Sequence, residues 1–371
     1  PVAHIGFFRT AFVERRSWLD DAAYADLVAL CQFLPGPASS QVGMAIGLRR
    51  AGWLGMLAAW TAFTLPSAIL LVLFASGLSA FGAADGAGWI AGLKAAAVAV
   101  VAQALLGMAR QLADGRERAT IAAIAAAVLV AFPSAWMQVV VIAAGAAAGL
   151  ALLRDLPPAP SAGGLEVPVS RAVAVAALSI FALLLVGLPL LSSATGSFAL
   201  AVFESFYRSG ALVFGGGHVV LPLLEAEVVP NGLVSESAFL AGYGAAQAVP
   251  GPLFTFAAFL GASLEGPVSG LAGAVLALVA IFLPAALLVV GGLPFWSRLR
   301  LLPTARSALA GVNAAVVGLL AAAFYDPVFT DGIVSGGAAA VAILAFLALV
   351  HWKVSPVVVV IGAGIAGGLF L

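Results

Sequence analysis

Two stretches, Gln32-Phe-Leu-Pro-Gly-Pro-Ala38 and Gln247-Ala-Val-Pro-Gly-Pro-Leu253, interrupt long apolar runs at matching places 215 residues apart. A helix cannot continue through Pro-Gly-Pro, because proline lacks the N–H group and clashes with the preceding turn. In lipid, such a break survives only where it is buried in protein or lines a cavity. Two matched breaks are therefore the sequence pointer to a transport site at a repeat interface.

The composition is that of a polytopic membrane protein. Of 371 residues, 63% are hydrophobic and 9% are charged, with a mean hydropathy of +1.16, whereas a soluble domain is roughly 25% charged. The apolar blocks approach the ~20 residues that a spanning helix needs, and a β-barrel would alternate instead. A net charge of zero excludes a polybasic nucleic-acid surface, and a single cysteine excludes an intramolecular disulfide and a Cys-based zinc site.

The two halves of the chain match at a steady offset. Pro66 pairs with Pro284 at an offset of 218, and Gly145 with Gly364 at 219. We expect residues 1–153 and 199–371 to be two copies of one unit, joined at 154–198 by a cytoplasmic loop and a linking transmembrane helix. The stretch 203–217 has no partner in the first copy, so we expect that copy to lack its first segment.

The positive charges predict that the second copy is inverted. The loop at 110–118 carries three arginines and belongs in the cytoplasm, which puts the loop around Asp85 outside. In the second copy the signs reverse: the counterpart of the first loop, 324–332, carries two aspartates. The counterpart of the second carries Arg298, Arg300 and Arg306.

Each copy is predicted to contain a broken segment, at 22–48 and at 237–264, followed by four spans. The spans are expected at 52–80, 88–109, 118–132 and 134–152, and at 267–292, 306–323, 333–350 and 354–371. The broken segments are best interpreted as re-entrant hairpins; the alternative is that each spans the membrane fully.

Each break begins a half-helix whose first N–H groups lack partners, and such a terminus attracts anions. Two opposed termini would suit a small, multiply charged oxyanion. The residues expected to contact it at the breaks are Gln32, Pro35, Gly36, Pro37, Ala38, Ser39 and Ser40, and Gln247, Pro250, Gly251, Pro252, Leu253, Phe254 and Thr255.

Other polar positions complete the candidate substrate site. Phe214-Gly-Gly-Gly217 is a second flexible concavity, so Gly215, Gly216, Gly217 and His218 are included. Lys94 is a candidate counter-charge within a predicted span, against the alternative that it snorkels, and Asn313 occupies its repeat position. His4 and His218 are candidate proton carriers or ordinary interior histidines.

Signatures of enzymes are absent from the sequence. It contains no H-E-x-x-H, G-x-x-x-x-G-K-[ST] or G-x-S-x-G motif, and three histidines with one cysteine do not make a metal site. We therefore expect no enzyme activity, no cofactor and no metal.

Several motifs resemble those of the chromate ion transporter family. They are Pro1-Val-Ala-His-Ile-Gly-Phe-Phe-Arg9, Phe12-Val-Glu-Arg-Arg-Ser-Trp-Leu19, Gln32 to Pro37, Phe214-Gly-Gly-Gly-His218 and Gln247 to Pro252. The resemblance covers essentially the whole chain in the long, two-copy form of that family. In the family a Phe-Gly-Gly-Pro motif precedes the first block, so Pro1 resembles its end, and Gly217 stands where the first copy usually has proline.

The resemblance implies proton-motive-force-dependent export of chromate across a bacterial inner membrane, conferring chromate resistance, with sulfate as the structural mimic. The implied partners are chromate, sulfate, protons and membrane lipid, and a homodimer is left open. The alternatives are a carrier for sulfate or another small oxyanion, and a passive anion channel. An intramembrane chromate reductase would need a redox cofactor site, against which the single cysteine argues.

Overall fold

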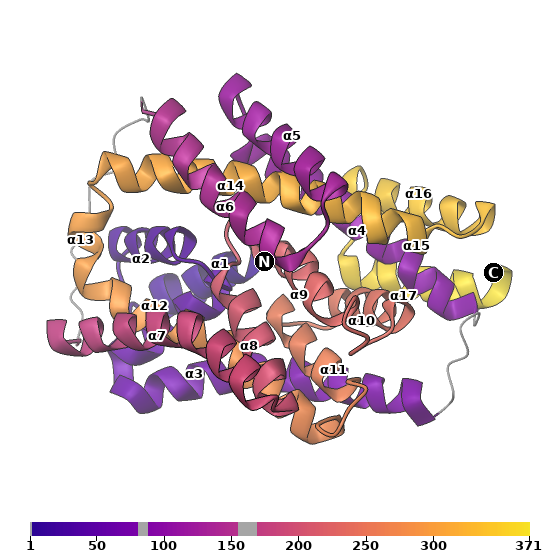
Figure 1. Ribbon diagram of the computed structural model, residues 1–371, viewed down its shortest axis with the longest axis horizontal. Coiled ribbons are helices and arrows are strands. Elements are labelled where there is room, and N and C mark those ends of the chain that lie inside the picture. The colour runs from indigo at the N-terminus through magenta and orange to yellow at the C-terminus, as the bar shows by residue number, and fades with distance from the viewer. Residues whose placement is uncertain (1, 81–87, 155–168) are drawn as a thin grey trace.

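The computed structural model describes residues 2–80, 88–154 and 169–371, and every regular element in these ranges is a helix (Figure 1). Within these described residues, six helices are long and apolar enough to cross a membrane. The prediction of an all-α polytopic membrane protein is confirmed. The predicted loop around Asp85 and most of the predicted linker loop lie outside the described residues.

The first broken segment is a helical hairpin. Helix α2, Asp21–Phe33, is capped by the Asp20 side chain, and helix α3, Ala38–Ala80, follows the break. Helix α3 is not continuous, because Ala51 and Gly52 have non-helical dihedral angles. Its first arm folds back onto its second, so that a Cβ on Gly47 would lie 2.3 Å from the carbonyl oxygen of Gly55.

The second broken segment repeats this arrangement. Helix α10, Glu236–Ala248, precedes the break, and η3, Leu253–Thr255, with α11, Phe256–Ala262, follows it. The chain then returns along α12, Gly270–Gly292, where a Cβ on Gly261 would lie 2.2 Å from the carbonyl oxygen of Gly273. Both α2 and α10 have 13 residues, about 20 Å, which is short of the ~30 Å hydrocarbon core. Neither helix can span the hydrocarbon core alone, and re-entrant hairpins stay a prediction.

The helices that follow the hairpins exchange partners between the two halves (Figure 1). Helix α4, Gly88–Leu112, packs against α16, Gly336–Val350, and α17, Pro356–Phe370. Helix α14, Pro303–Ala323, packs against α5, Arg116–Ala131, and α6, Ala135–Leu152.

Glycines bring these helices into backbone contact. A Cβ on Gly92 of α4 would lie 2.0 Å from the carbonyl oxygen of Ala363, and one on Gly311 of α14 would lie 2.0 Å from that of Gly145. The offset of 219 relates Gly92 to Gly311 and α6 to α17. The contact of Gly92 with α17 therefore corresponds to the contact of Gly311 with α6, as expected for two copies related by a two-fold axis. The two-copy organisation stays a prediction.

The remaining helices connect and flank these units. Helix α7, Arg171–Thr195, links the halves, and α8, Phe198–Ala211, packs against α7 and α12. The others are α1, Val2–Arg9; η1, Thr10–Arg15; η2, Gly217–Val219; α9, Val220–Val228; η4, Leu293–Phe295; α13, Trp296–Leu299; η5, Phe324–Phe329; and α15, Thr330–Gly332.

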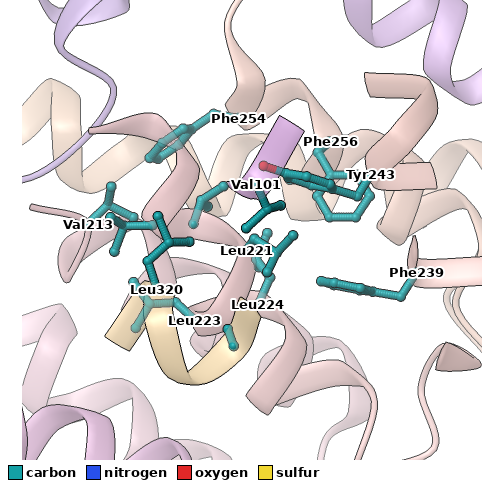
Figure 2. Close-up of a cluster of buried hydrophobic side chains, with 14 of the residues drawn as sticks. Val101, Val213, Leu221, Leu223, Leu224, Phe239, Tyr243, Phe254, Phe256 and Leu320 are labelled. Carbon is teal, nitrogen blue, oxygen red and sulfur yellow. The ribbon is translucent and has the colours of Figure 1, made fainter. Parts of the chain in front are cut away.

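A buried apolar cluster holds the second break in place. Figure 2 shows Phe254 of η3, Phe256 of α11 and Tyr243 of α10 gathered around Leu221 of α9, with Leu320 of α14 beside them. Each is 0% exposed. The second break therefore rests on a dry, close-packed core rather than on lipid.

Candidate functional site

A cavity of about 1080 Å³ lies where the two breaks meet. Its wall contains Gly36, Pro37 and Ala38 of the first break and Pro250, Gly251 and Pro252 of the second. The glycine loop at 215–217 and one side of α2 also line it. Segments far apart in the sequence thus share one internal space, as the matched breaks predict.

The first break presents a helix N-terminus to this cavity. The N–H of Gly36 donates to the carbonyl of Val213 at 2.7 Å, and Nε2 of Gln41 donates to the carbonyl of Pro35 at 2.8 Å. The N–H of Gln41 donates to the carbonyl of Pro37 at 3.0 Å and so closes the first turn of α3. The amides of Ala38, Ser39 and Ser40 lie within that turn, and they are the donors that a helix leaves for a ligand.

The second break is held by hydrogen bonds from two hydroxyl groups and one amide. The Ser67 hydroxyl on α3 donates to the carbonyl of Pro250 at 2.6 Å. The hydroxyl and the N–H of Thr255 both donate to the carbonyl of Pro252, at 2.8 and 3.0 Å. Thr255 is buried and does not line the cavity, so its predicted donor groups are already engaged.

The glycine loop adds His218 to the cavity wall. Nδ1 of His218 lies 2.9 Å from the hydroxyl of Tyr243 on α10, which ties the loop to the second hairpin. This contact matches the interpretation of His218 as a hydrogen-bonded interior histidine. His4 of α1 also lines the cavity, its ring edge-on to Phe63 at 5.2 Å.

Two buried amide groups in the cavity wall have unused hydrogen-bonding atoms. Nε2 of Gln247 and Oδ1 of Asn313 have no partner among the residues that the structure describes. Buried polar atoms are nearly always paired, so such atoms are free to bind a ligand or water. Gln247 can donate to an anion, while Oδ1 of Asn313, next to Gly215, can only accept.

The charged residues of the wall are mainly basic. Arg118 of α5, Arg300 after α13 and Arg306 of α14 line the cavity together with Asp26 of α2. Oδ1 of Asp26 accepts from Nε1 of Trp296 at 2.8 Å and from Nη1 of Arg300 at 3.4 Å. The wall therefore carries more positive than negative formal charge, which favours an anion.

Most of the predicted site residues meet at this cavity, but some do not. Those that line it are Gln32, Gly36, Pro37, Ala38, Ser39, Gly215, Gly216, Gly217, His218, Gln247, Pro250, Gly251, Pro252, Leu253, Phe254 and Asn313. Pro35, Ser40, Lys94 and Thr255 lie outside it. Substrate contact by any of these residues stays a prediction.

Lys94 lies beside an acidic group instead of in the cavity. It is close enough to Glu236, the first residue of α10, to lower the pKa of that carboxyl. Burial outweighs this effect and, with Asp331 and Asp326 nearby, raises the pKa of Glu236 to about 7. The expectation that Lys94 faces the substrate from the same cavity as Asn313 is not met in this conformation.

The basic residues of the wall are not among the predicted site residues. In the sequence, Arg118, Arg300 and Arg306 indicate only the orientation of the chain in the membrane. One sequence feature could have identified these arginines as site residues. The loops that carry them, at 110–118 and 298–306, are both predicted to lie on the cytoplasmic side of the membrane.

Comparison with known proteins gives consistent matches. The model of a family described as chromate transporter matches residues 1–150 and 200–368, two regions on either side of the predicted linker. A chromate transport protein of Pseudomonas aeruginosa is 30% identical over all of this chain and 88% of its own length. Relatives from Synechococcus elongatus, a probable chromate transport protein, and from Cupriavidus metallidurans, a chromate transport protein, are each 28% identical. Both cover 87% of this chain, and 79% and 77% of their own lengths. No solved structure matches.

Proposed function

The chain belongs to the chromate transporter family, and from that premise we propose that it exports chromate, a tetrahedral dianion, across the bacterial inner membrane by alternating access, conferring chromate resistance. The curated relatives are named as transport proteins, not as enzymes. Several apolar helices support a multi-pass membrane protein. No group of three or more His, Cys, Asp or Glu residues in the described ranges could hold a metal ion.

The observation that carries the proposal is the shared cavity. It brings a helix N-terminus at Ala38 and Ser39, the free Nε2 of Gln247 and the arginines of the wall around one space. Amide dipoles and side-chain donors can replace part of the hydration shell of a small oxyanion. The wall offers such donors from both halves of the chain.

The side on which the cavity opens supports export. Gln111, Arg118, Arg306 and Ser355 line it, and all come from helix ends that the charge pattern assigns to the cytoplasm. A basic mouth on that side raises the local anion concentration. An inside-negative potential then favours outward movement of a dianion by about 4.6 kcal/mol per 100 mV.

The packing of the breaks supports alternating access. A Cβ on Gly36 would lie 3.0 Å from the Cβ of Ala285 on α12, and one on Gly251 would lie 1.8 Å from Oγ of Ser67 on α3. The offset of 218 pairs Ser67 with Ala285, so each break rests on the same helix of the other copy. Rocking of one copy against the other would move both breaks together.

Reconstituted vesicles test the proposal. We expect chromate loaded on one side to accelerate labelled chromate entry from the other, as carriers do, and an inside-negative potential to drive chromate outward. Sulfate should compete only at higher concentration. Transport of sulfate but not of chromate would show that chromate is not the substrate. Ion-channel currents without trans-stimulation would show that the protein is a channel and not a carrier.

Replacing Arg118 with glutamine is expected to raise the chromate concentration for half-maximal export roughly two- to fivefold at low salt, because a partly exposed charge contributes up to about 1 kcal/mol. The effect should shrink at high ionic strength. The measurement is export against chromate concentration at two salt concentrations. Arg116→Gln, an exposed arginine two residues earlier that does not line the cavity, is the control, and an equal effect in both variants would contradict the assignment.

A further inference from the structure

A buried group of charges lies apart from the cavity, between α8 and α9. Nη2 of Arg208 donates to Oε2 of Glu227 at 2.6 Å, and Nε of Arg208 lies 3.2 Å from Oε1 of Glu204, one turn earlier on α8. The side chains of Glu204, Arg208 and Glu227 are 11%, 14% and 7% exposed. We propose that this triad is a proton-binding site of the carrier, with Glu204 as the group that takes up the proton; this rests on the proposed transport function.

The charge balance of the triad calls for a proton. One guanidinium cannot neutralise two carboxylates, and an uncompensated buried charge is strongly unfavourable. On its remaining side Arg208 faces an aromatic ring, with its Cζ 5.2 Å from the ring centre of Trp136 on α6. Arg208 and Glu227 are the charged groups that act on Glu204 in the described part of the chain. Uptake of one proton makes the triad neutral.

The geometry selects Glu204 over Glu227 as the proton acceptor. Glu227 accepts a short charge-assisted hydrogen bond, and such bonds favour the ionised carboxylate. Oε1 of Glu204 and Nε of Arg208 are buried and face each other without hydrogen-bonding geometry, and neither has another partner within the described residues. Protonation of Glu204 therefore weakens only the contact between Glu204 and Arg208, which is the weaker of the two, and leaves the hydrogen bond between Arg208 and Glu227 in place.

The triad is mechanically connected to the cavity. Helices α8 and α9 are the two arms that hold the loop 212–216, and Gly215, Gly216 and Gly217 line the cavity. The Arg208–Glu227 bond crosses between these arms, so a change of charge on Glu204 alters the contact that holds them together. Helix α7 is predicted to cross from the cytoplasmic loop to the exterior, so α8 begins at Phe198 near the exterior and Glu204 lies within two turns of that end. The proton would therefore enter from the side opposite the cavity mouth.

In the proposed transport cycle, one proton moves inward for each anion that moves outward. A water-borne proton binds an Oε atom of Glu204 on the outer side and leaves again to water on the inner side, with no bond made or broken in the anion. Because the anion and the proton use separate groups, anion exchange can continue when Glu204 no longer titrates.

The test uses the full chain in vesicles with the membrane potential clamped at zero. The internal pH is fixed on the alkaline side, so that chromate stays a dianion, and only the external pH is varied. Wild-type export should accelerate severalfold as the external pH falls. Glu204→Gln should lose this acceleration while keeping chromate-for-chromate exchange within about twofold of the wild type. Glu265→Gln, an exposed carboxyl after α11, is the control and should keep the acceleration.

A second variant covers the case in which Glu204→Gln does not fold. Glu227→Gln removes the negative charge beside Glu204, so the external pH at half-maximal acceleration should move to a lower value. Retained acceleration in Glu204→Gln, an unmoved midpoint in Glu227→Gln, or wild-type export that ignores external pH while exchange is normal would each overturn the proton site. Absence of chromate exchange in the wild type would overturn the proposed function itself.

Discussion

Replacing Gly251 with alanine is expected to lower chromate transport by more than about 100-fold, which corresponds to about 2.7 kcal/mol. Gly251 has φ +144°, a conformation that L side chains rarely adopt, and its Cβ would lie 1.8 Å from Oγ of Ser67. The strain alone costs about 1–3 kcal/mol, and the overlap pushes the break away from α3. The measurement is chromate export in vesicles at matched protein density.

Two further variants show whether the overlap is the cause. Gly196→Ala also places alanine at positive φ, but with nothing within 4 Å and away from the cavity, so it should retain transport. Adding Ser67→Gly to Gly251→Ala removes the colliding hydroxyl and should restore part of the flux. Normal transport by Gly251→Ala itself would mean that the contact between the second break and α3 is dispensable.

Ser39→Pro is expected to abolish transport while leaving membrane insertion intact. Proline removes the N–H of a residue in the cavity wall, and it disfavours the helical conformation of Ala38 before it. Both effects remove the ordered donors at the N-terminus of α3. The measurements are chromate export and the elution profile of the purified protein in detergent.

Ser39→Ala separates the hydroxyl from the amide. It keeps the backbone donor, so we expect it to retain export within about fivefold of the wild type, the worth of one neutral hydrogen bond of about 1 kcal/mol. If the alanine variant is as inactive as the proline variant, the hydroxyl is the essential group. If Ser39→Pro transports normally, the amide has no part in the site.

The breaks could be located from the sequence because Pro-Gly-Pro has one physical meaning in an apolar run. The same argument could not place Thr255, because its hydroxyl turns back to the carbonyl of Pro252 in a turn whose form depends on the packing of Phe254 and Phe256. Nor could it show that Arg118 and Arg306 face one cavity. That proximity arises from the packing of α14 against α5, a contact between the two halves.

Lys94 shows a different limit of the sequence argument. The repeat offset pairs Lys94 of α4 with Asn313 of α14 and so treats the two positions as equivalent. In the structure Asn313 lines the cavity, whereas Lys94 lies near Glu236. Under the proposed exchange of conformations, Lys94 would take the place of Asn313 in a cavity open to the exterior.

The exchanged packing of α4 and α14 bears on how such a chain can assemble. The glycine-lined surfaces of α4 and α14 are each covered by helices of the other half. Helices α16 and α17 pack on α4, and α5 and α6 pack on α14. If the two copies are inverted, as the charge pattern predicts, a polypeptide of half this length would need a second one in the opposite orientation before its packing was complete. A single chain that carries both halves always supplies them one to one, whereas separate chains would have to meet in the bilayer.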